Sequence, residues 1–182
     1  MAERIAVLGW GSLLWEGRRE FDPWHGPWLY DGPLLRLEFS RVSSSRSGAL
    51  TLAIDPENGV PTMVAYCFSR RSNILEAIED LRARESASAQ GIGSLRIAGE
   101  ASCRDRESRE AILDWATERQ IDEVLSTDLR SNFVEKTGRR FSVPTAVAYL
   151  DALGPEERAK ALEYLRRAPS FVRTPLREAV QT

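Results

Sequence analysis

Ile5-Ala6-Val7-Leu8-Gly9-Trp10-Gly11-Ser12-Leu13 is the stretch on which the prediction of the fold rests. Its first four residues form an unbroken apolar run, which is typical of a buried strand. The run ends at a loop with two glycines, and glycine lets the main chain turn sharply and approach a ligand closely. Clustered main-chain amides in such loops bind carboxylates and phosphates. The stretch therefore predicts a buried N-terminal strand followed by a small anion-binding loop.

Two common phosphate-binding motifs do not fit this loop. A P-loop needs a longer spacing between its glycines than the single residue that separates Gly9 from Gly11. The dinucleotide-binding fingerprint needs a third glycine at the position of Leu14. Taken alone, the loop also fits a plain glycine turn that binds nothing, so its interpretation depends on the rest of the chain.

Length and composition exclude several classes of protein. The chain has 182 residues, of which 42% are hydrophobic and 29% charged, and this size predicts a single domain with its own core. A formal net charge of −2, with arginines interleaved among acidic residues, argues against general nucleic-acid binding. Two cysteines, Cys67 and Cys103, do not make a disulfide framework. With no apolar stretch of membrane-helix length and no signal-peptide pattern, we expect a cytoplasmic protein that binds neither membranes nor nucleic acids.

Strand patterns dominate the first part of the chain. Apolar residues alternate with polar ones at 35–39 and 50–54, which predicts two strands with one buried face each. A further strand is expected over 62–68, and the turn at 55–59 predicts that it forms a hairpin with the strand before it. An aromatic segment rich in turn residues, 15–33, is interpreted either as a lid or pocket wall, or as a packed surface loop.

Helical spacing replaces this alternation later in the chain. Apolar residues recur at helical intervals from Asn73, a candidate N-cap, to about Arg84. The second half is predicted to be mostly helical, with Ser142 as the N-cap of one helix, and short strands are expected at 93–97 and 121–127. Residues 86–90 are small and polar and are expected to form a loop.

Together these elements predict an α+β fold with a mixed, partly barrelled sheet and surrounding helices. We expect one domain over 1–182, with a β-rich core at 1–100 and a mostly helical extension at 101–182.

Few residues of the usual catalytic types are present. His25 is the only histidine, no G-x-S-x-G elbow accompanies it, and one histidine with two distant cysteines does not make a zinc site. Catalysis would therefore use carboxylates, hydroxyls, arginines and main-chain amides. Glu85 follows the predicted helix end, where the helix dipole disfavours negative charge, and such a field raises the pKa of a carboxyl group toward that of a general acid/base. The alternative is a surface glutamate paired with Arg82 or Arg84.

Several segments, in this order, resemble the γ-glutamylcyclotransferase superfamily in its ChaC-type form. Gly9-Trp10-Gly11-Ser12-Leu13-Leu14-Trp15 resembles its G-Y-G-S-L-I-W loop. Phe39-Ser40-Arg41 and Leu50-Thr51-Leu52 resemble its S-R and T-L strand segments, and Leu81-Arg82-Ala83-Arg84-Glu85 resembles its L-x-x-R-E helix end. The resemblance covers residues 5–97.

The resemblance implies a γ-glutamyl substrate, whose own α-amine attacks its γ-carbonyl to form 5-oxoproline and release an amine. It implies that Glu85 is the catalytic acid/base and that no metal or cofactor is needed. The residues implied in substrate binding are Gly9, Trp10, Gly11, Ser12, Leu13 and Arg41.

The chain also departs from the pattern of that superfamily. Trp10 stands in place of the usual tyrosine, and the G-G-Y that follows the glutamate in the superfamily is missing after Glu85. Residues 104–182, including Asn132-Phe133, have no recognised counterpart. A non-catalytic small-molecule-binding module on the same fold is therefore the alternative, and an unrelated α+β interaction protein is a third interpretation. The sequence indicates neither the leaving amine nor the oligomeric state.

Overall fold

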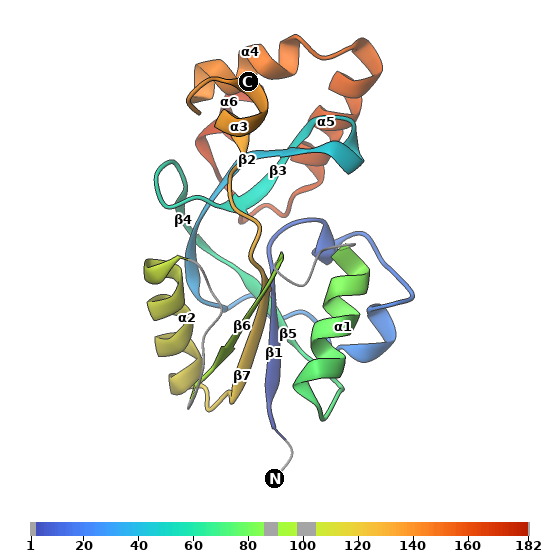
Figure 1. Ribbon diagram of the computed structural model, residues 1–182, viewed down its shortest axis with the longest axis vertical. Helices are drawn as coiled ribbons and strands as arrows, with labels where there is room; N and C mark the ends of the chain where they lie inside the picture. Colours follow the sequence, from blue (N-terminus) through green and yellow to red (C-terminus); the bar gives the residue numbers. More distant parts are fainter. Residues whose placement is uncertain (1–2, 86–90, 98–104, 182) are drawn as a thin grey trace. The chain divides into compact units, whose positions relative to one another are not determined.

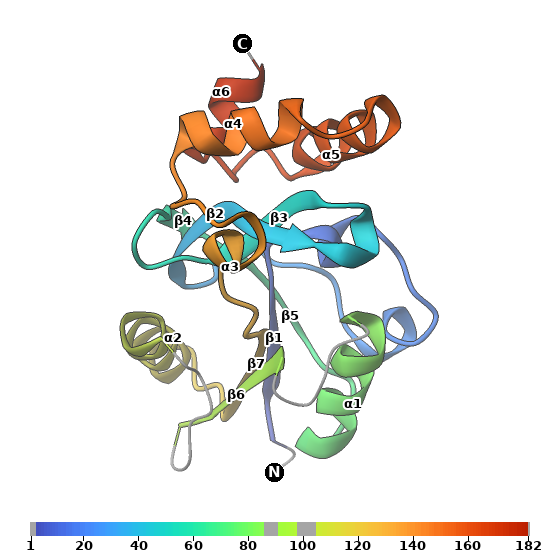
Figure 2. The same ribbon diagram turned by 45° about the horizontal axis from the view of Figure 1, so that its top comes forward.

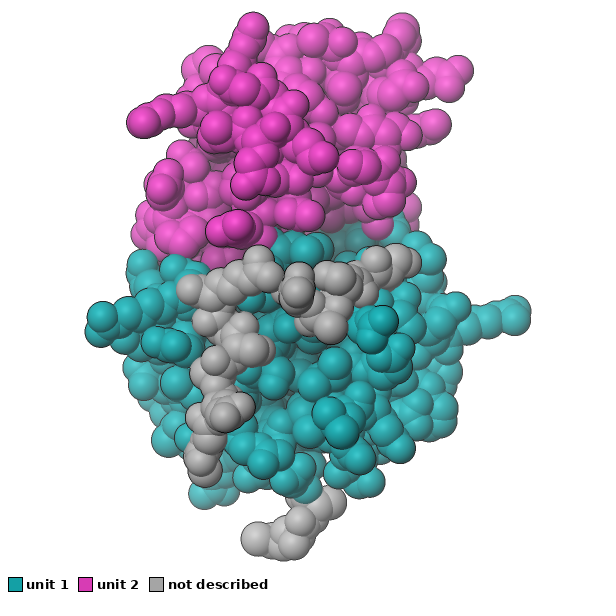
Figure 3. All heavy atoms as spheres, in the orientation of Figure 1, with its two compact units in different colours: residues 1–35, 63–129 teal, residues 36–62, 130–182 magenta. Residues whose placement is uncertain are grey.

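The computed structural model describes residues 3–85, 91–97 and 105–181, and its elements are labelled in Figure 1. The chain divides into two compact units, which are coloured separately in Figure 3. Unit 1 comprises 1–35 and 63–129, and unit 2 comprises 36–62 and 130–182. Each unit thus combines residues from both sides of the expected division at residue 100. The expected loop at 86–90 and Cys103 lie outside the described residues.

Unit 1 contains a mixed four-stranded sheet with the order β5-β1-β7-β6. Its strands are β1 (Ile5–Gly9), β5 (Ala65–Phe68), β6 (Ile92–Arg96) and β7 (Glu123–Thr127). β1 is antiparallel to β5 and parallel to β7, and β6 is antiparallel to β7. All five residues of β1 are buried, which confirms the buried N-terminal strand.

The unit 1 sheet lies between two helices, α1 (Ile74–Glu85) and α2 (Arg106–Glu118), as both Figure 1 and Figure 2 show. Asn73 accepts a hydrogen bond from the amide of Leu75 at 2.8 Å, which supports its role at the start of α1. Leu81 of α1 packs in one buried cluster with Val7 of β1 and Cys67 of β5. The thiol of Cys67 is buried, and burial raises its pKa well above the usual value.

The aromatic segment 15–33 packs onto the same unit. Phe21 is 2% exposed and belongs to the buried cluster, against which Trp28 also packs. Leu29 pairs with Tyr66 of β5, and two aromatic side chains, Trp24 and Tyr30, remain exposed. These contacts are those expected of a packed loop.

Unit 2 contains a three-stranded sheet with the order β3-β2-β4. Its strands are β2 (Leu34–Ser43), β3 (Ala49–Ile54) and β4 (Val60–Met63). The predicted hairpin of 50–54 with 62–68 is wrong, because β2 lies between β3 and β4. The turn after β3 packs against β2, because a Cβ atom at Gly59 would lie 2.6 Å from the carbonyl carbon of Arg36, and the chain then pairs with the other edge of β2.

The predicted single strand at 62–68 is also corrected. It is split at Val64 into β4 and β5, which belong to different sheets. The amide of Val64 donates to the carbonyl of Pro33, so the chain is held at the interruption itself. A continuous apolar run does not reveal such a change of partner.

The helices of unit 2 are α3 (Phe133–Thr137), α4 (Val143–Asp151), α5 (Pro155–Arg167) and α6 (Pro175–Gln181). Ser142 caps α4 through a capping box with Thr145, as its sequence predicts. α5 packs on β3, and α4, α5 and α6 contact one another. The described residues thus confirm the α+β class with two sheets and six α-helices, and neither sheet closes into a barrel.

Candidate functional site

The glycine loop leads from β1 into a single 3-10 turn at Ser12–Leu14. The amide of Leu14 donates to the carbonyl of Gly11 at 3.0 Å, and those of Trp15 and Glu16 donate to the carbonyl of Ser12. Within the described part of the chain, the amides of Gly11 and Leu13 take no hydrogen bond. Main-chain amides that lack such a partner are the kind of group that can bind an anion.

The side chains of the loop point into the protein. Trp10 is 4% exposed, Ser12 and Leu13 are also buried, and Leu13 belongs to the buried cluster of unit 1. At Gly9 a Cβ atom would lie 2.8 Å from the ring of Trp28, so aromatic packing requires glycine there. The loop can therefore contact a ligand mainly through its main chain, and Trp10 acts as a packing residue.

Arg84 connects the loop to the helix end that carries Glu85. Its side chain is 2% exposed, and its Nη2 donates to the carbonyls of Ser12 and Glu16, both at 2.9 Å. Its Nη1 lies 3.5 Å from Oε1 of Glu85, whose side chain is 18% exposed. The structure thus brings the predicted loop and the predicted acid/base into one neighbourhood of unit 1.

This ion pair modifies the expected electrostatics of Glu85. The end of a helix disfavours a carboxylate, whereas a guanidinium beside it favours the ionised form. Of the alternative, a surface glutamate paired with Arg82 or Arg84, the pair with Arg84 is observed, but the Glu85 side chain is only 18% exposed and that of Arg84 is 2% exposed. Because the Arg84 guanidinium is buried, water screens its charge from Glu85 less than it screens an exposed ion pair.

Sequence patterns alone assign Arg84 no role at the site. The signal was nevertheless present, because Ala77, Leu81 and Arg84 follow helical spacing and all three are buried on one face of α1. A charged residue on the buried face of a helix needs partners, and the carbonyls of the loop supply them.

Arg41 belongs to unit 2, whereas the 9–13 loop and Glu85 belong to unit 1. Its Nη1 donates to the carbonyl of Arg130 at 2.8 Å. Burial lowers the pKa of Arg41, and the charge of Glu135 opposes that shift. The contacts of Arg41 within unit 2 are therefore structural, and its role in substrate binding stays a prediction.

Asn132-Phe133 gains a role that the sequence did not reveal. The side chain of Asn132 accepts from the amide of Val42 at 2.7 Å and donates to the carbonyl of Val42 at 3.1 Å. Phe133 is 1% exposed and packs edge-on against the rings of Phe141 and Tyr149. The pair thus fastens the start of α3 to β2.

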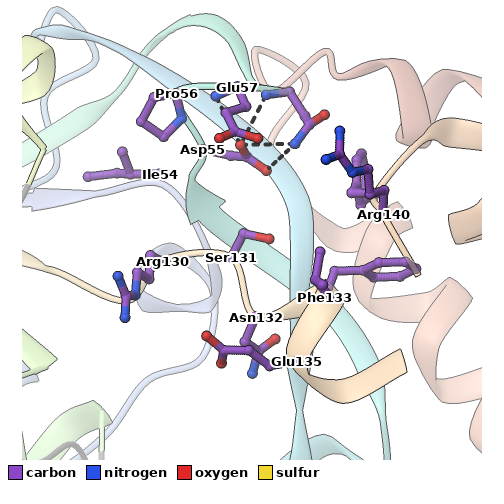
Figure 4. A pocket seen from close by; sticks show the side chains of 13 residues that line it. Ile54, Asp55, Pro56, Glu57, Arg130, Ser131, Asn132, Phe133, Glu135 and Arg140 are labelled. Carbon is purple, nitrogen blue, oxygen red and sulfur yellow. Dashed lines mark hydrogen bonds between the residues drawn. The ribbon is translucent and has the colours of Figure 1, made fainter. Parts of the chain in front are cut away.

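A pocket of about 710 Å³ lies within unit 2, between the turn after β3 and the segment around α3 (Figure 4). Charged side chains of both signs line it, among them Glu57, Glu135, Arg130 and Arg140. Asp55 also lines the pocket, but its carboxylate already accepts from the amides of Glu57 and Asn58. Sequence patterns did not indicate this pocket, because its two walls come from distant parts of the chain.

The sequence also predicts that the chain has no zinc site and no membrane helix, and it contains a single histidine, His25. Among the residues that the structure describes, no histidine, cysteine and carboxylate side chains cluster as metal ligands would. None of the described helices is both long and apolar enough to cross a membrane. The ring of His25 stacks on Phe21, with ring centroids 4.6 Å apart.

Comparison with known proteins finds no family model that matches the chain, no matching curated protein and no matching solved structure.

Proposed function

We propose that the chain is a γ-glutamylcyclotransferase-like enzyme that converts a γ-glutamyl peptide or amine into 5-oxoproline and a free amine. The observation that carries this proposal is the set of contacts made by Arg84. They join the turn at Ser12–Leu14 to the helix end at Glu85, because one guanidinium contacts the carbonyls of Ser12 and Glu16 as well as the Glu85 carboxylate.

The reaction is an intramolecular aminolysis. The α-amine of the substrate attacks its own γ-carbonyl carbon, a new C–N bond closes the five-membered ring, and the original amide C–N bond breaks. Glu85 removes a proton from the attacking nitrogen and returns it to the leaving nitrogen, so that the carboxylate is regenerated. No water is consumed.

The residues of the site match these demands. The nucleophile belongs to the substrate, so no histidine-based triad is required. Holding the amine against the carbonyl exploits proximity, which contributes about 7–11 kcal/mol in favourable cases. The amides of Gly11 and Leu13 are suited to hold the substrate carboxylate or the oxyanion that develops on the γ-carbonyl.

The test is to incubate the protein with γ-glutamyl dipeptides, glutathione and γ-glutamyl amines and to quantify 5-oxoproline. We expect release from at least one of these classes, in equal amounts with the free amine. Matched α-glutamyl dipeptides are the control, because their α-nitrogen cannot close the same ring by expelling the attached amine. Failure to release 5-oxoproline from every γ-glutamyl class would contradict the proposal.

The second candidate is a non-catalytic module that binds a small molecule, and the unit 2 pocket favours it. Its volume of about 710 Å³ lies in the range of small-molecule sites, and its mixed charges suit an amino-acid-like zwitterion. Saturable binding of γ-glutamyl compounds without turnover, weakened by Arg140→Ala and retained in Glu85→Gln, would favour this candidate over the enzyme.

A further inference from the structure

We propose that Arg84 is a positioning residue for Glu85, which both fixes the end of α1 against the glycine loop and keeps the Glu85 carboxylate ionised as a base. The part of this inference that concerns catalysis rests on the proposed function. The part that concerns the ionisation of Glu85 does not.

The positioning effect follows from the geometry of the guanidinium. One nitrogen, Nη2, donates to two carbonyls of the loop, those of Ser12 and Glu16, while Nη1 faces Glu85 at 3.5 Å. The guanidinium is planar and makes these contacts simultaneously through donors in fixed directions, whereas the ammonium of lysine is a single point charge on a flexible side chain. Arg84 therefore sets the distance between the loop and the helix end as a rigid spacer.

The electrostatic effect follows from burial and pairing. Glu85 is the one carboxylate at ion-pair distance from the Arg84 guanidinium among the described residues. On α1 itself, Arg82 pairs with Glu79. Arg84 is therefore the arginine of α1 that lies at ion-pair distance from Glu85 in the described structure.

Charges on the neighbouring elements complete this picture. β6 and β7 pack against α1, and their charged residues Arg96 and Glu123 are paired with each other. Glu16 follows the 3-10 turn, and its carbonyl, like that of Ser12, faces the guanidinium of Arg84. Arg96 of β6 is thus paired with Glu123, and Arg84 is the arginine for which an ion pair with Glu85 is observed.

The first test compares Arg84→Gln and Arg84→Lys with Arg82→Gln, a control on the exposed face of the same helix, in the pH dependence of kcat/KM for 5-oxoproline release. In Arg84→Gln we expect the acidic limb of the kcat/KM profile to move to a higher pH by about 1 unit or more, because the positive charge beside Glu85 is lost. In Arg84→Lys we expect the acidic limb to stay at the wild-type pH, because the positive charge is kept. We expect kcat to fall about tenfold or more, because the contacts of the guanidinium with the loop are lost. Arg82→Gln should keep both the wild-type kcat and the wild-type position of the acidic limb.

Two results would overturn the inference. One is an Arg84→Gln profile whose acidic limb overlays that of the wild type, and the other is a fully active Arg84→Lys. If Arg84→Gln does not fold, Arg84→Lys decides, since an acidic limb displaced from the wild-type position in that variant contradicts the proposed role of the charge.

The second test needs no turnover. The carboxyl carbon of Glu85 is titrated by 13C NMR in wild type and in the Arg84 variants, with Glu85→Gln used to assign its signal. We expect a higher midpoint in Arg84→Gln than in wild type or Arg84→Lys, and equal midpoints would overturn the inference. If no 5-oxoproline forms, the proposed function fails, while this titration still decides the role of Arg84.

Discussion

The guanidinium of Arg84 donates to the main-chain carbonyl of Ser12 at 2.9 Å, across 72 positions of sequence. This bond joins two segments that sequence patterns identify separately, the glycine loop and the helix end at Glu85. It also explains why an arginine stands on the buried face of α1. The proposed chemistry depends on this connection, because a carboxylate acts as an acid/base only when it reaches the bound substrate.

Replacing Gly9 with alanine is expected to destabilise the protein. The new Cβ atom would lie 2.8 Å from the Trp28 ring and 3.0 Å from Leu14, so the packed ring must shift. We expect a loss of about 1–3 kcal/mol in the free energy of unfolding, measured by urea denaturation. Gly26→Ala is the matched control, since its Cβ atom would meet only the carbonyl oxygen of Phe68 at 3.6 Å. Equal stability of Gly9→Ala and wild type would contradict the packing role of Gly9.

Asn132→Ala is expected to loosen the start of α3. The change removes two hydrogen bonds to Val42 and leaves both main-chain groups of that buried residue without these bonds. Such a loss costs about 1–3 kcal/mol of unfolding free energy. Val134→Ala, at an exposed position of the same helix, should change stability by no more than about 0.5 kcal/mol. If the two variants were equally stable, the hydrogen bonds of Asn132 would not fasten this segment.

Arg177→Lys is expected to weaken the C-terminal part of unit 2. Arg177 is 8% exposed, and its guanidinium donates to four carbonyls, namely those of Arg166, Ala168, Pro169 and Val172. Burial lowers its pKa. An ammonium has only three donors, so at least one buried carbonyl loses its partner, at a cost of about 1–3 kcal/mol.

The control for this prediction is Arg173→Lys. Arg173 pairs with Glu178 at 3.3 Å, but its side chain is 78% exposed, so the exchange should leave the urea midpoint nearly unchanged. A midpoint for Arg177→Lys that equals that of Arg173→Lys would show that the four carbonyls do not need the guanidinium.

Glu38 predicts a specific dependence of stability on pH. Glu38 is 1% exposed, and burial raises the pKa of its carboxyl group above 4.5 despite hydrogen bonds from Thr174 and from the amides of Phe39 and Leu176. Because the folded-state pKa lies above the unfolded one, the protonated carboxyl stabilises the fold at low pH. This contribution is lost as the pH rises from below 4.5 through the raised folded-state pKa.

The measurement is the free energy of unfolding of wild type minus that of Glu38→Gln, from urea denaturation between about pH 4 and pH 8. The glutamine does not titrate, so we expect this difference to fall with rising pH and then to level off. A difference that rises with pH would mean that the hydrogen bonds to Glu38 outweigh its burial.

Local patterns in the sequence predicted most of the single elements. The apolar run at 5–8 became β1, helical spacing from Asn73 became α1, and Ser142 caps α4. Pairing between strands was predicted less well. The strand expected at 62–68 changes sheets at Val64, and β2 separates β3 from β4. Both features depend on partners distant in sequence, which the period of a strand does not encode.

The candidate site was predicted in part for a related reason. Glycine spacing and the helix end are local signals, so the sequence alone indicates the 9–13 loop and Glu85 as candidate residues. The contacts of Arg84 with the loop were not predicted, because its partners are main-chain carbonyls far along the chain and any residue type supplies a carbonyl. The walls of the unit 2 pocket are likewise brought together only by folding.

The most direct test of the proposed chemistry is the rate of 5-oxoproline release by Glu85→Gln, relative to wild type, on the best γ-glutamyl substrate. Glu79→Gln is the matched control, because Glu79 lies on the same helix, is exposed and pairs with Arg82. We predict that Glu85→Gln lowers kcat by about 10²–10⁴-fold while Glu79→Gln retains the wild-type rate. A Glu85→Gln protein that is folded and releases 5-oxoproline at the wild-type rate would contradict the assignment of Glu85 as the acid/base.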